Sequence, residues 1–278
     1  MSIEIEKISP PQIRRFRQKV LSYYAKSARD LPWRKTTDPY SILVSEIMLQ
    51  QTQVDRVIPF YRAFLERWPT IQDLAQANLS EVLESWSGLG YNRRARMLRD
   101  AAIIIVSHFD GDVIKAMQAF GDIPGIGPYT ANAVRIFSTN EDIATVDTNI
   151  RRTLIHEFGL DEKTPQKDLW NLAARCIPKG KSRLWHNAMM DFGSTVQTSL
   201  KTGIRPVNKQ SRFEGSDRQL RGKALRHMVT SEQLTSTFKD IADATGEITT
   251  SSRLQNVLSG LKKDGLIREK CGIYSLAH

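Results

Sequence analysis

One stretch, IPGIGPYTANAV at residues 123–134, indicates the fold most sharply. Gly125 and Gly127 stand two apart just before an apolar helical run, so the turn can adopt backbone angles that other residues avoid. Main-chain N–H groups at the start of the next helix are then free to face an anion. We predict a partner helix over residues 113–120, before the turn. The alternative is an ordinary loop with glycine caps.

The charge of the chain favours an anionic partner. The 278 residues include 40 Lys and Arg against 30 Asp and Glu, which gives a formal charge of +10. Basic side chains that neutralise phosphates release condensed counterions, although many basic proteins bind no nucleic acid. Together with helix, glycine-rich turn and helix, this charge predicts a helix-hairpin-helix motif that holds one DNA strand without reading its sequence.

Composition and targeting signals favour a globular protein inside the cell. With 40% hydrophobic and 25% charged residues, the chain is neither disordered throughout nor fibrous. No apolar run approaches about 18 residues, and the N-terminus lacks the layout of a signal peptide. Cys176 and Cys271 are too far apart for a local metal site and are expected to be free thiols. We expect a cytoplasmic protein, associated with the nucleoid in a prokaryote.

Helical periodicity runs through the first two thirds of the chain, and strand patterns are nearly absent before residue 265. Helices are predicted over residues 11–28, 41–51 and 55–67, with a further one opening at Asn78 or Ser80. The predicted fold class is therefore all-α.

A polar linker and a small module follow. Residues 201–216 are rich in Gly, Pro, Asn and Ser, and basic residues dominate from 201 to 226, which fits a solvated linker or a surface that follows phosphates. Helices at 220–228, 238–244 and 252–263, then a hairpin turning at Cys271 and Gly272, predict a winged-helix-like module. Such modules place the third helix in the DNA major groove or contact only proteins.

Two carboxylates stand out. Asp147, in VDTNIRR at residues 146–152, opens a helix expected to run to His156, where an ordinary N-cap is the simplest interpretation. Glu46 lies in the apolar run ILVSEIML at residues 42–49. It either faces solvent, the ordinary case, or sits in a desolvated site that raises its pKa.

These motifs, in this order, resemble the helix-hairpin-helix base-excision DNA glycosylases related to endonuclease III, and most closely the MutY-type adenine glycosylases. The resemblance spans roughly residues 12–200. It rests on these stretches: LPWRKTTDPYSILVSEIMLQQTQVDRVIPFY (31–61), WSGLGYNRRARML (86–98), IPGIGPYTANAV (123–134), VDTNIRR (146–152) and NAMMDFG (187–193).

The resemblance implies roles for the two carboxylates. Glu46 falls on the acid that protonates the purine N7 and helps activate water, which needs a carboxyl kept protonated by apolar surroundings. Asp147 falls on the carboxylate that stays ionised and stabilises the cationic sugar, helped by a helix N-terminus that lowers its pKa. Asn149 is expected near the sugar or Asp147. Tyr129 stands where strand-cleaving members carry a lysine, so the implied enzyme is monofunctional.

The resemblance also implies residues that contact DNA. Gln50, Gln51 and Tyr91 match residues that fill the duplex or wedge beside the opposing base after the target is flipped out. Surface polar residues and one core aromatic are the alternative. Further expected contacts come from Arg93, Arg94, Arg96, Gly125, Gly127 and Thr130.

The chain departs from the family in its metal ligands. Most relatives carry four cysteines, spaced six, two and five apart, that bind a [4Fe–4S] cluster. A gap-free continuation puts Gln197, Ile204, Val207 and Phe213 at those places. We therefore expect no cluster and no other cofactor, with Ile204, Val207 and Phe213 packed on an apolar core instead.

The implied fold has two helical subdomains and a C-terminal module. The predicted domains are residues 1–30 plus 141–200, residues 31–140 with the hairpin motif, the linker 201–216 and the module 217–278. The implied partner is double-stranded DNA with a mismatched or damaged base, bound by a monomer. The module is too short for the Nudix-like reader of 8-oxoguanine, and Asn92 replaces a tyrosine of many adenine enzymes. Adenine opposite guanine or 8-oxoguanine is the first substrate hypothesis, thymine or uracil opposite guanine the second, and a non-catalytic DNA-binding protein the third.

Overall fold

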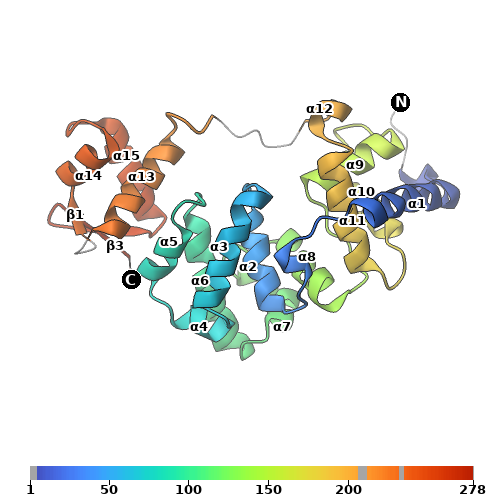
Figure 1. Ribbon diagram of the computed structural model, residues 1–278, viewed down its shortest axis with the longest axis horizontal. Helices are drawn as coiled ribbons and strands as arrows, with labels where there is room; N and C mark the ends of the chain where they lie inside the picture. The colour runs from blue at the N-terminus through green and yellow to red at the C-terminus, as the bar shows by residue number, and fades with distance from the viewer. Residues whose placement is uncertain (1–4, 206–211, 232–234, 278) are drawn as a thin grey trace. The chain divides into compact units, whose positions relative to one another are not determined.

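The computed structural model describes residues 5–205, 212–231 and 235–277 (Figure 1). Helices dominate, and the expected helical architecture with a small C-terminal module is confirmed. The α-helices are α1 (Pro10–Ser27), α2 (Pro39–Leu49), α3 (Val54–Arg67), α4 (Ile71–Gln76), α5 (Leu79–Trp86), α6 (Arg93–Phe109), α7 (Val113–Gln118), α8 (Pro128–Thr139), α9 (Thr148–Phe158), α10 (Gln166–Cys176), α11 (Ser182–Thr195), α12 (Ser199–Thr202), α13 (Asp217–Thr230), α14 (Phe238–Thr245) and α15 (Ser252–Lys263). Short 3-10 helices cover Ile5–Lys7, Pro32–Arg34 and Phe120–Asp122, and the strands are β1 (Thr235–Thr237), β2 (Ile267–Lys270) and β3 (Ile273–Leu276).

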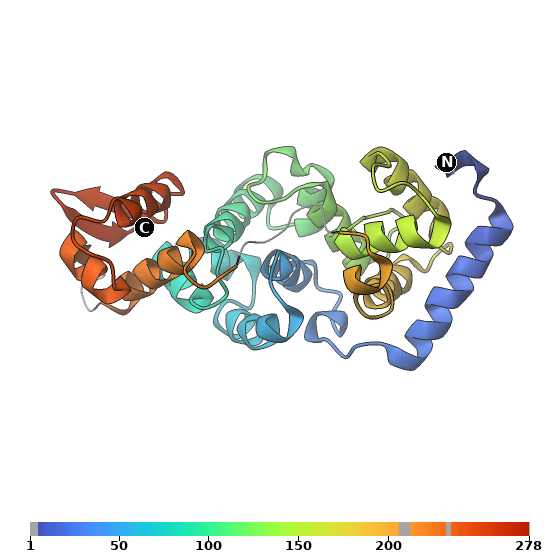
Figure 2. The same cartoon turned by 90° about the horizontal axis from the view of Figure 1, so that it is seen from above.

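The first compact unit consists of residues 1–46, 117–121 and 126–209. Its core joins α1 to α10 and α11, so segments far apart in the sequence lie side by side (Figure 2). The Phe16 ring meets the rings of Phe158 and Trp185 edge-on, with centroids 5.1 and 5.6 Å away. Edge-to-face aromatic pairs add stabilisation beyond the area that they bury.

A buried charge cluster fastens the N-terminal segment to α11 in the same unit. The Asp191 side chain is fully buried and accepts hydrogen bonds from Arg29 Nε at 2.5 Å and from both terminal nitrogens of Arg34 at 2.8 Å. These donors hold the pKa of Asp191 below its ordinary value, against the opposing effect of burial. Because a buried carboxylate without its cations is costly, the cluster fixes the start of the segment that leads into α2.

The second unit consists of residues 47–116, 122–125 and 210–278. Its helical part packs α6 against α4 and α5. Phe64 of α3 lies between Trp68 and Trp86, with ring centroids 4.8 and 5.9 Å away. The predicted domain limits group the residues differently from these two units and stay a prediction.

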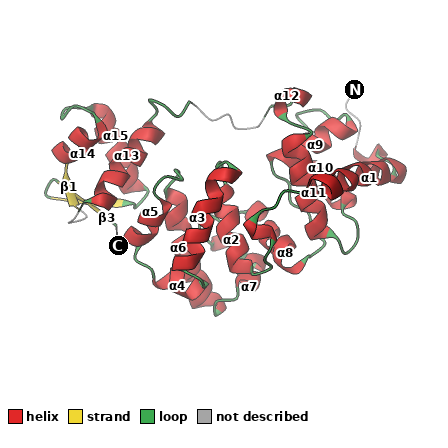
Figure 3. Ribbon diagram, viewed as in Figure 1, coloured by secondary structure: helices red, strands yellow, loops and turns green. Residues whose placement is uncertain are grey.

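The C-terminal module has the three helices and the hairpin expected from the sequence. In the described part of the chain, strands lie in this module alone (Figure 3). The sheet order is β1-β3-β2 with antiparallel neighbours, and Thr235 pairs with Ser275 while Ile267 pairs with Leu276. β1 was not predicted, because three residues, Thr-Ser-Thr, carry no alternation of polar and apolar positions.

Predicted helix limits agree with the observed ones to within a few residues. The helix predicted over 41–51 begins at Pro39 and ends at Leu49, because Asp38 caps its start by accepting a hydrogen bond from the Ser41 N–H at 2.7 Å. The partner helix predicted over 113–120 ends at Gln118. Among the described residues, helices are too short or too polar to cross a membrane.

Candidate active site

The site lies in the first unit, and Glu46 on α2 is its most buried acidic group. α2 is apolar on every face: Tyr40, Ile42, Leu43, Val44, Ile47 and Met48 are all buried. A helix that is apolar all round is buried all round, and Glu46 is therefore only 6% exposed. The solvent-facing alternative is thus wrong. Burial, together with the charge of Asp147, raises the pKa of Glu46 to about 7, although a hydrogen bond from Tyr129 opposes the rise.

Tyr129 comes from the start of α8, directly after the glycine-rich turn. Gly127 is the N-cap of α8 and Pro128 its first residue, so the turn fixes where the next side chain lies. The Tyr129 hydroxyl donates to the Glu46 carboxylate. Its own pKa is raised well above the ordinary value by burial and by the neighbouring carboxylates, so it remains a donor.

Asp147 is the N-cap of α9. Its Oδ1 accepts from the Ile150 N–H at 2.6 Å, and its Oδ2 accepts from Asn149 Nδ2 at 3.0 Å. We expected the helix N-terminus to lower the pKa of Asp147, and this prediction is wrong. Burial raises the pKa of Asp147 more than these hydrogen bonds and the charge of Arg152 lower it.

Arg152 holds the Asn149 side chain in place. This buried guanidinium donates to Asn149 Oδ1 at 2.7 Å, to the Gly193 carbonyl at 2.8 Å and to the Gln197 carbonyl at 2.5 Å. A Cβ atom on Gly193 would lie 2.9 Å from atoms of Asn149, so only glycine lets α11 approach α9 this closely. Sequence reasoning missed this role of Arg152, although the VDTNIRR motif contains it.

His186 of α11 holds the segment before Asp147 in place. Its Nε2 accepts the Thr145 N–H at 3.3 Å, and its Nδ1 lies 2.8 Å from the Ser182 carbonyl. Burial lowers the pKa of His186 to about 4, so at neutral pH the ring is uncharged and can accept at one nitrogen while donating at the other. Sequence reasoning missed this role of His186. The one available signal was its position directly before the NAMMDFG stretch.

The residues expected to contact DNA differ in backbone conformation and in burial. Gln51 and Tyr91 adopt left-handed backbone angles, with φ of 56° and 50°. Non-glycine residues held in this region cost energy and gather at ligand-binding sites, which suits the expected wedge. Gly125 is also left-handed, at φ 76°, whereas Gly127 is extended. Thr130 is only 3% exposed, so its side chain cannot be a surface contact.

Arg94 is not a phosphate contact. It is buried, and its terminal nitrogens donate to the carbonyls of Ile47, Met48, Gln50 and Gly90 and to Thr52 Oγ1, at 2.5 to 3.0 Å. The guanidinium therefore satisfies the unpaired carbonyls where α2 ends. Arg93 is exposed, near Asp264 at 3.9 Å, and Arg96 donates to the Asp264 carbonyl at 2.6 Å.

The four places that correspond to cluster cysteines do not offer metal ligands. Gln197 is buried and donates to Glu157 Oε1 at 2.5 Å, and Ile204 packs in the core of the first unit, as expected. Phe213 is half exposed and stacks on Arg218, so its expected place in an apolar core is wrong. Val207 lies outside the described residues. No group of three or more His, Cys, Asp or Glu side chains able to hold a metal occurs within residues 5–205, 212–231 and 235–277.

Comparison with known proteins adds independent observations. Residues 44–179 match the HhH-GPD superfamily of base excision DNA repair proteins. The chain is 35% identical to the adenine DNA glycosylase of Mycolicibacterium smegmatis over 280 positions, which cover 93% of this chain and 94% of that protein. A thermostable thymine-DNA glycosylase superposes with a TM-score of 0.63 at 31% identity, over 66% of this chain and 87% of the other. Endonuclease III in a non-covalent DNA complex superposes with a TM-score of 0.60 at 20% identity, over 68% and 87% of the chains, and shares the fold.

Proposed function

Because the chain belongs to the HhH-GPD superfamily of base excision DNA repair proteins, and within it to the adenine DNA glycosylases, we propose that it hydrolyses the N-glycosidic bond of adenine mispaired with guanine or 8-oxoguanine. One observation carries the proposal. Glu46, Tyr129 and Asp147, spread over a hundred residues of sequence, meet in one compact unit, where a buried acid of pKa about 7 lies beside a second carboxylate. A pure DNA-binding protein has no use for such a pair.

The first step is loss of the base. With the adenine flipped out of the stack, protonated Glu46 donates its proton to N7. The bond from C1′ to N9 breaks, and its electron pair leaves with the now neutral adenine. The sugar becomes an oxocarbenium-like cation, which the negative charge of Asp147 stabilises. Hydrogen bonds from Ile150 and Asn149 favour that ionised form of Asp147.

The second step is addition of water. The Glu46 carboxylate, freed of its proton, accepts one from a water molecule, and the resulting hydroxide oxygen bonds to C1′. Glu46 ends protonated, as it began, and the products are adenine and an abasic site. Tyr129 orients Glu46 through its hydroxyl. It has no amine for a Schiff base, so we propose that the enzyme does not cut the strand.

We propose that no iron–sulfur cluster takes part. Hydrogen bonds of Arg152 and Gln197 and the packing of Ile204 occupy the region where relatives bind one. We further propose that the protein acts as a cytoplasmic, nucleoid-associated monomer on duplex DNA, with Gln50, Gln51 and Tyr91 entering the duplex and Arg93, Gly125 and Gly127 at the backbone.

The test is cleavage of duplexes that hold one A:8-oxoguanine, A:G, T:G or U:G pair, followed by alkali. We expect scission at the adenine-containing pairs only, and only after alkali. Scission without alkali would contradict the monofunctional mechanism. Absence of any scission despite tight binding would contradict the enzyme hypothesis and favour a non-catalytic DNA-binding protein.

A mismatch pyrimidine glycosylase is the second candidate. The 31% identity to a thymine-DNA glycosylase over two thirds of the chain favours it. In that case the T:G or U:G duplex is cleaved and the adenine duplexes stay intact, so the same four duplexes separate the two candidates.

A further inference from the structure

A groove in the second unit lies where helix α13 passes residues 87–92. Its volume is about 470 Å³, and its lining includes Arg56 of α3 together with Arg218, Lys223 and Arg226 of α13. We call it the α13 groove. All of its lining residues are described, and no Asp or Glu is among them. Four cations around a hollow without a carboxylate form a site for an anion.

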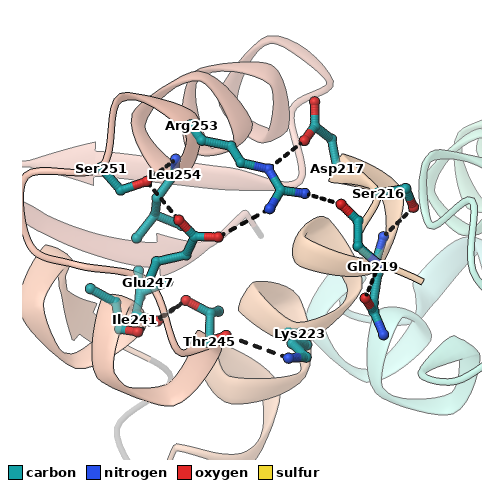
Figure 4. A network of polar contacts seen from close by, with 12 residues as sticks. Ser216, Asp217, Gln219, Lys223, Ile241, Thr245, Glu247, Ser251, Arg253 and Leu254 are labelled. Atoms are coloured by element: carbon teal, nitrogen blue, oxygen red, sulfur yellow. Dashed lines mark hydrogen bonds and ion pairs between the residues drawn. The ribbon is translucent and has the colours of Figure 1, made fainter. Parts of the chain in front are cut away.

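Two acidic residues at or near the start of α13 form ion pairs with arginines outside the groove. Asp217 pairs with Arg253 at 2.8 Å, and Glu214 pairs with Arg212 at 3.0 Å (Figure 4 shows the first pair). Arg226 and Lys223 are exposed, and Lys223 Nζ reaches only the Thr245 carbonyl, at 3.4 Å. Among the described residues, Lys223 and Arg226 therefore have no carboxylate partner, and their charges remain available.

Aromatic stacking fixes one wall of the groove. The Arg218 guanidinium lies over the rings of Tyr91 and Phe213, 5.3 and 5.5 Å from their centroids, and donates to the Tyr91 hydroxyl. Cation–π contacts of this kind hold a guanidinium in place while leaving its charge intact. The stack thus keeps α13 beside Tyr91, one of the residues expected to enter DNA.

Two of the three basic residues of helix α15, the third helix of the module, are paired within the module. Arg253 donates to Asp217 at 2.8 Å, to Glu247 at 3.2 Å and to the Gly215 carbonyl at 2.6 Å (Figure 4). Lys262 pairs with Glu269 of β2 at 2.5 Å. In winged-helix proteins this helix usually enters the major groove, yet here two of its basic side chains brace the module.

We propose that the module binds the phosphodiester backbone of substrate DNA through the α13 groove, and does not read base edges through α15. The inference rests on the proposed function for its choice of polyanion. Phosphate contacts position a protein on the duplex without sequence preference. That property suits an enzyme whose target base occurs in any sequence. Gln51, another residue expected to contact DNA, also lines the groove.

The test compares two double variants of the full chain that lose the same charge. Lys223→Ala/Arg226→Ala removes the exposed cations of the groove, and Lys263→Ala/Arg268→Ala removes exposed cations of α15 and β2. Affinity for an undamaged duplex and an A:G duplex is measured by fluorescence anisotropy from 50 to 200 mM KCl. Each lost phosphate contact lowers the slope of log K against log salt by about 0.9. We expect the groove pair to lose about 2 in slope on both duplexes, and the control pair to lose nothing.

Two results would overturn the inference: equal losses for both pairs, which would indicate general charge, or a loss confined to the control pair, which would indicate α15 as the DNA-binding face. Restoring charge with Lys223→Arg/Arg226→Lys should restore the slope, and matching melting temperatures exclude misfolding as the cause. Adenine excision by the unmodified chain is measured separately. If excision is absent while the groove pair still loses slope, the proposed function fails and the DNA-binding groove stands.

Discussion

Replacing Glu46 by Gln should stabilise the folded chain at high pH while abolishing base excision. Burial moves the pKa of Glu46 from 4.5 to about 7, which corresponds to about 3 kcal/mol at 1.36 kcal/mol per pKa unit. The folded chain binds this proton more tightly than the unfolded chain does. The stabilisation is therefore fully present below pH 4.5 and is lost as the pH rises to about 7. Gln carries no charge at any pH, and its Oε1 can still accept from Tyr129.

The measurement is urea denaturation of both proteins at pH 5 and pH 8. The difference in unfolding free energy between Glu46→Gln and the unmodified chain should shift in favour of the variant by about 2.5 kcal/mol over this range. Glu66→Gln, at an exposed position on α3, is the matched control and should show no such shift. A difference that is the same at both pH values would refute the assignment of Glu46 as the desolvated acid. Single-turnover excision by the unmodified chain should fall about tenfold per pH unit above 7, because the acid must be protonated.

Three further predictions concern the supports of the site. Asp147→Asn keeps a helix cap but loses the negative charge, so the rate of excision should fall by about 100-fold or more. The affinity for the duplex, measured by fluorescence anisotropy, should stay unchanged. An unchanged rate of excision would favour the non-catalytic hypothesis. Arg94→Ala leaves several buried carbonyls without donors and should lower the unfolding free energy in urea by about 3 kcal/mol, whereas the exposed Arg93→Ala should change it by less than about 0.5 kcal/mol. Gly193→Ala introduces a Cβ 2.9 Å from Asn149 and should cost about 1–3 kcal/mol in the same assay; a neutral result would contradict the tight approach of α11 to α9.

Local signals in the sequence predicted most of the fold. Helix periodicity placed α1, α3 and α15, and the cap of α5, which is Asn78, was one of the two residues predicted to open that helix, because caps and apolar stripes are properties of short segments. β1 was missed because its pairing with β3 depends on residues forty positions away. A three-residue strand is defined by its partner more than by its own composition.

The site was predictable in its residue types and less so in its energetics. The burial of Glu46 follows from α2 being apolar on every face, which the sequence already displays, but the pKa also depends on Asp147 a hundred residues later. Arg94 shows the limit of assigning DNA contacts from a family resemblance. Its guanidinium meets carbonyls at the end of α2, and only the tertiary structure brings them together.

The cluster of Arg29, Arg34 and Asp191 joins groups about 160 residues apart in the sequence. On the ribosome, Glu46 emerges some 145 residues before Asp191, and at 5–20 residues per second this is a delay of about 7–30 s. During that interval α2, apolar on every face, has no finished core to enter. The apolar surface of nascent α2 therefore stays exposed until the later helices are made, and slower synthesis of those helices lengthens this exposure.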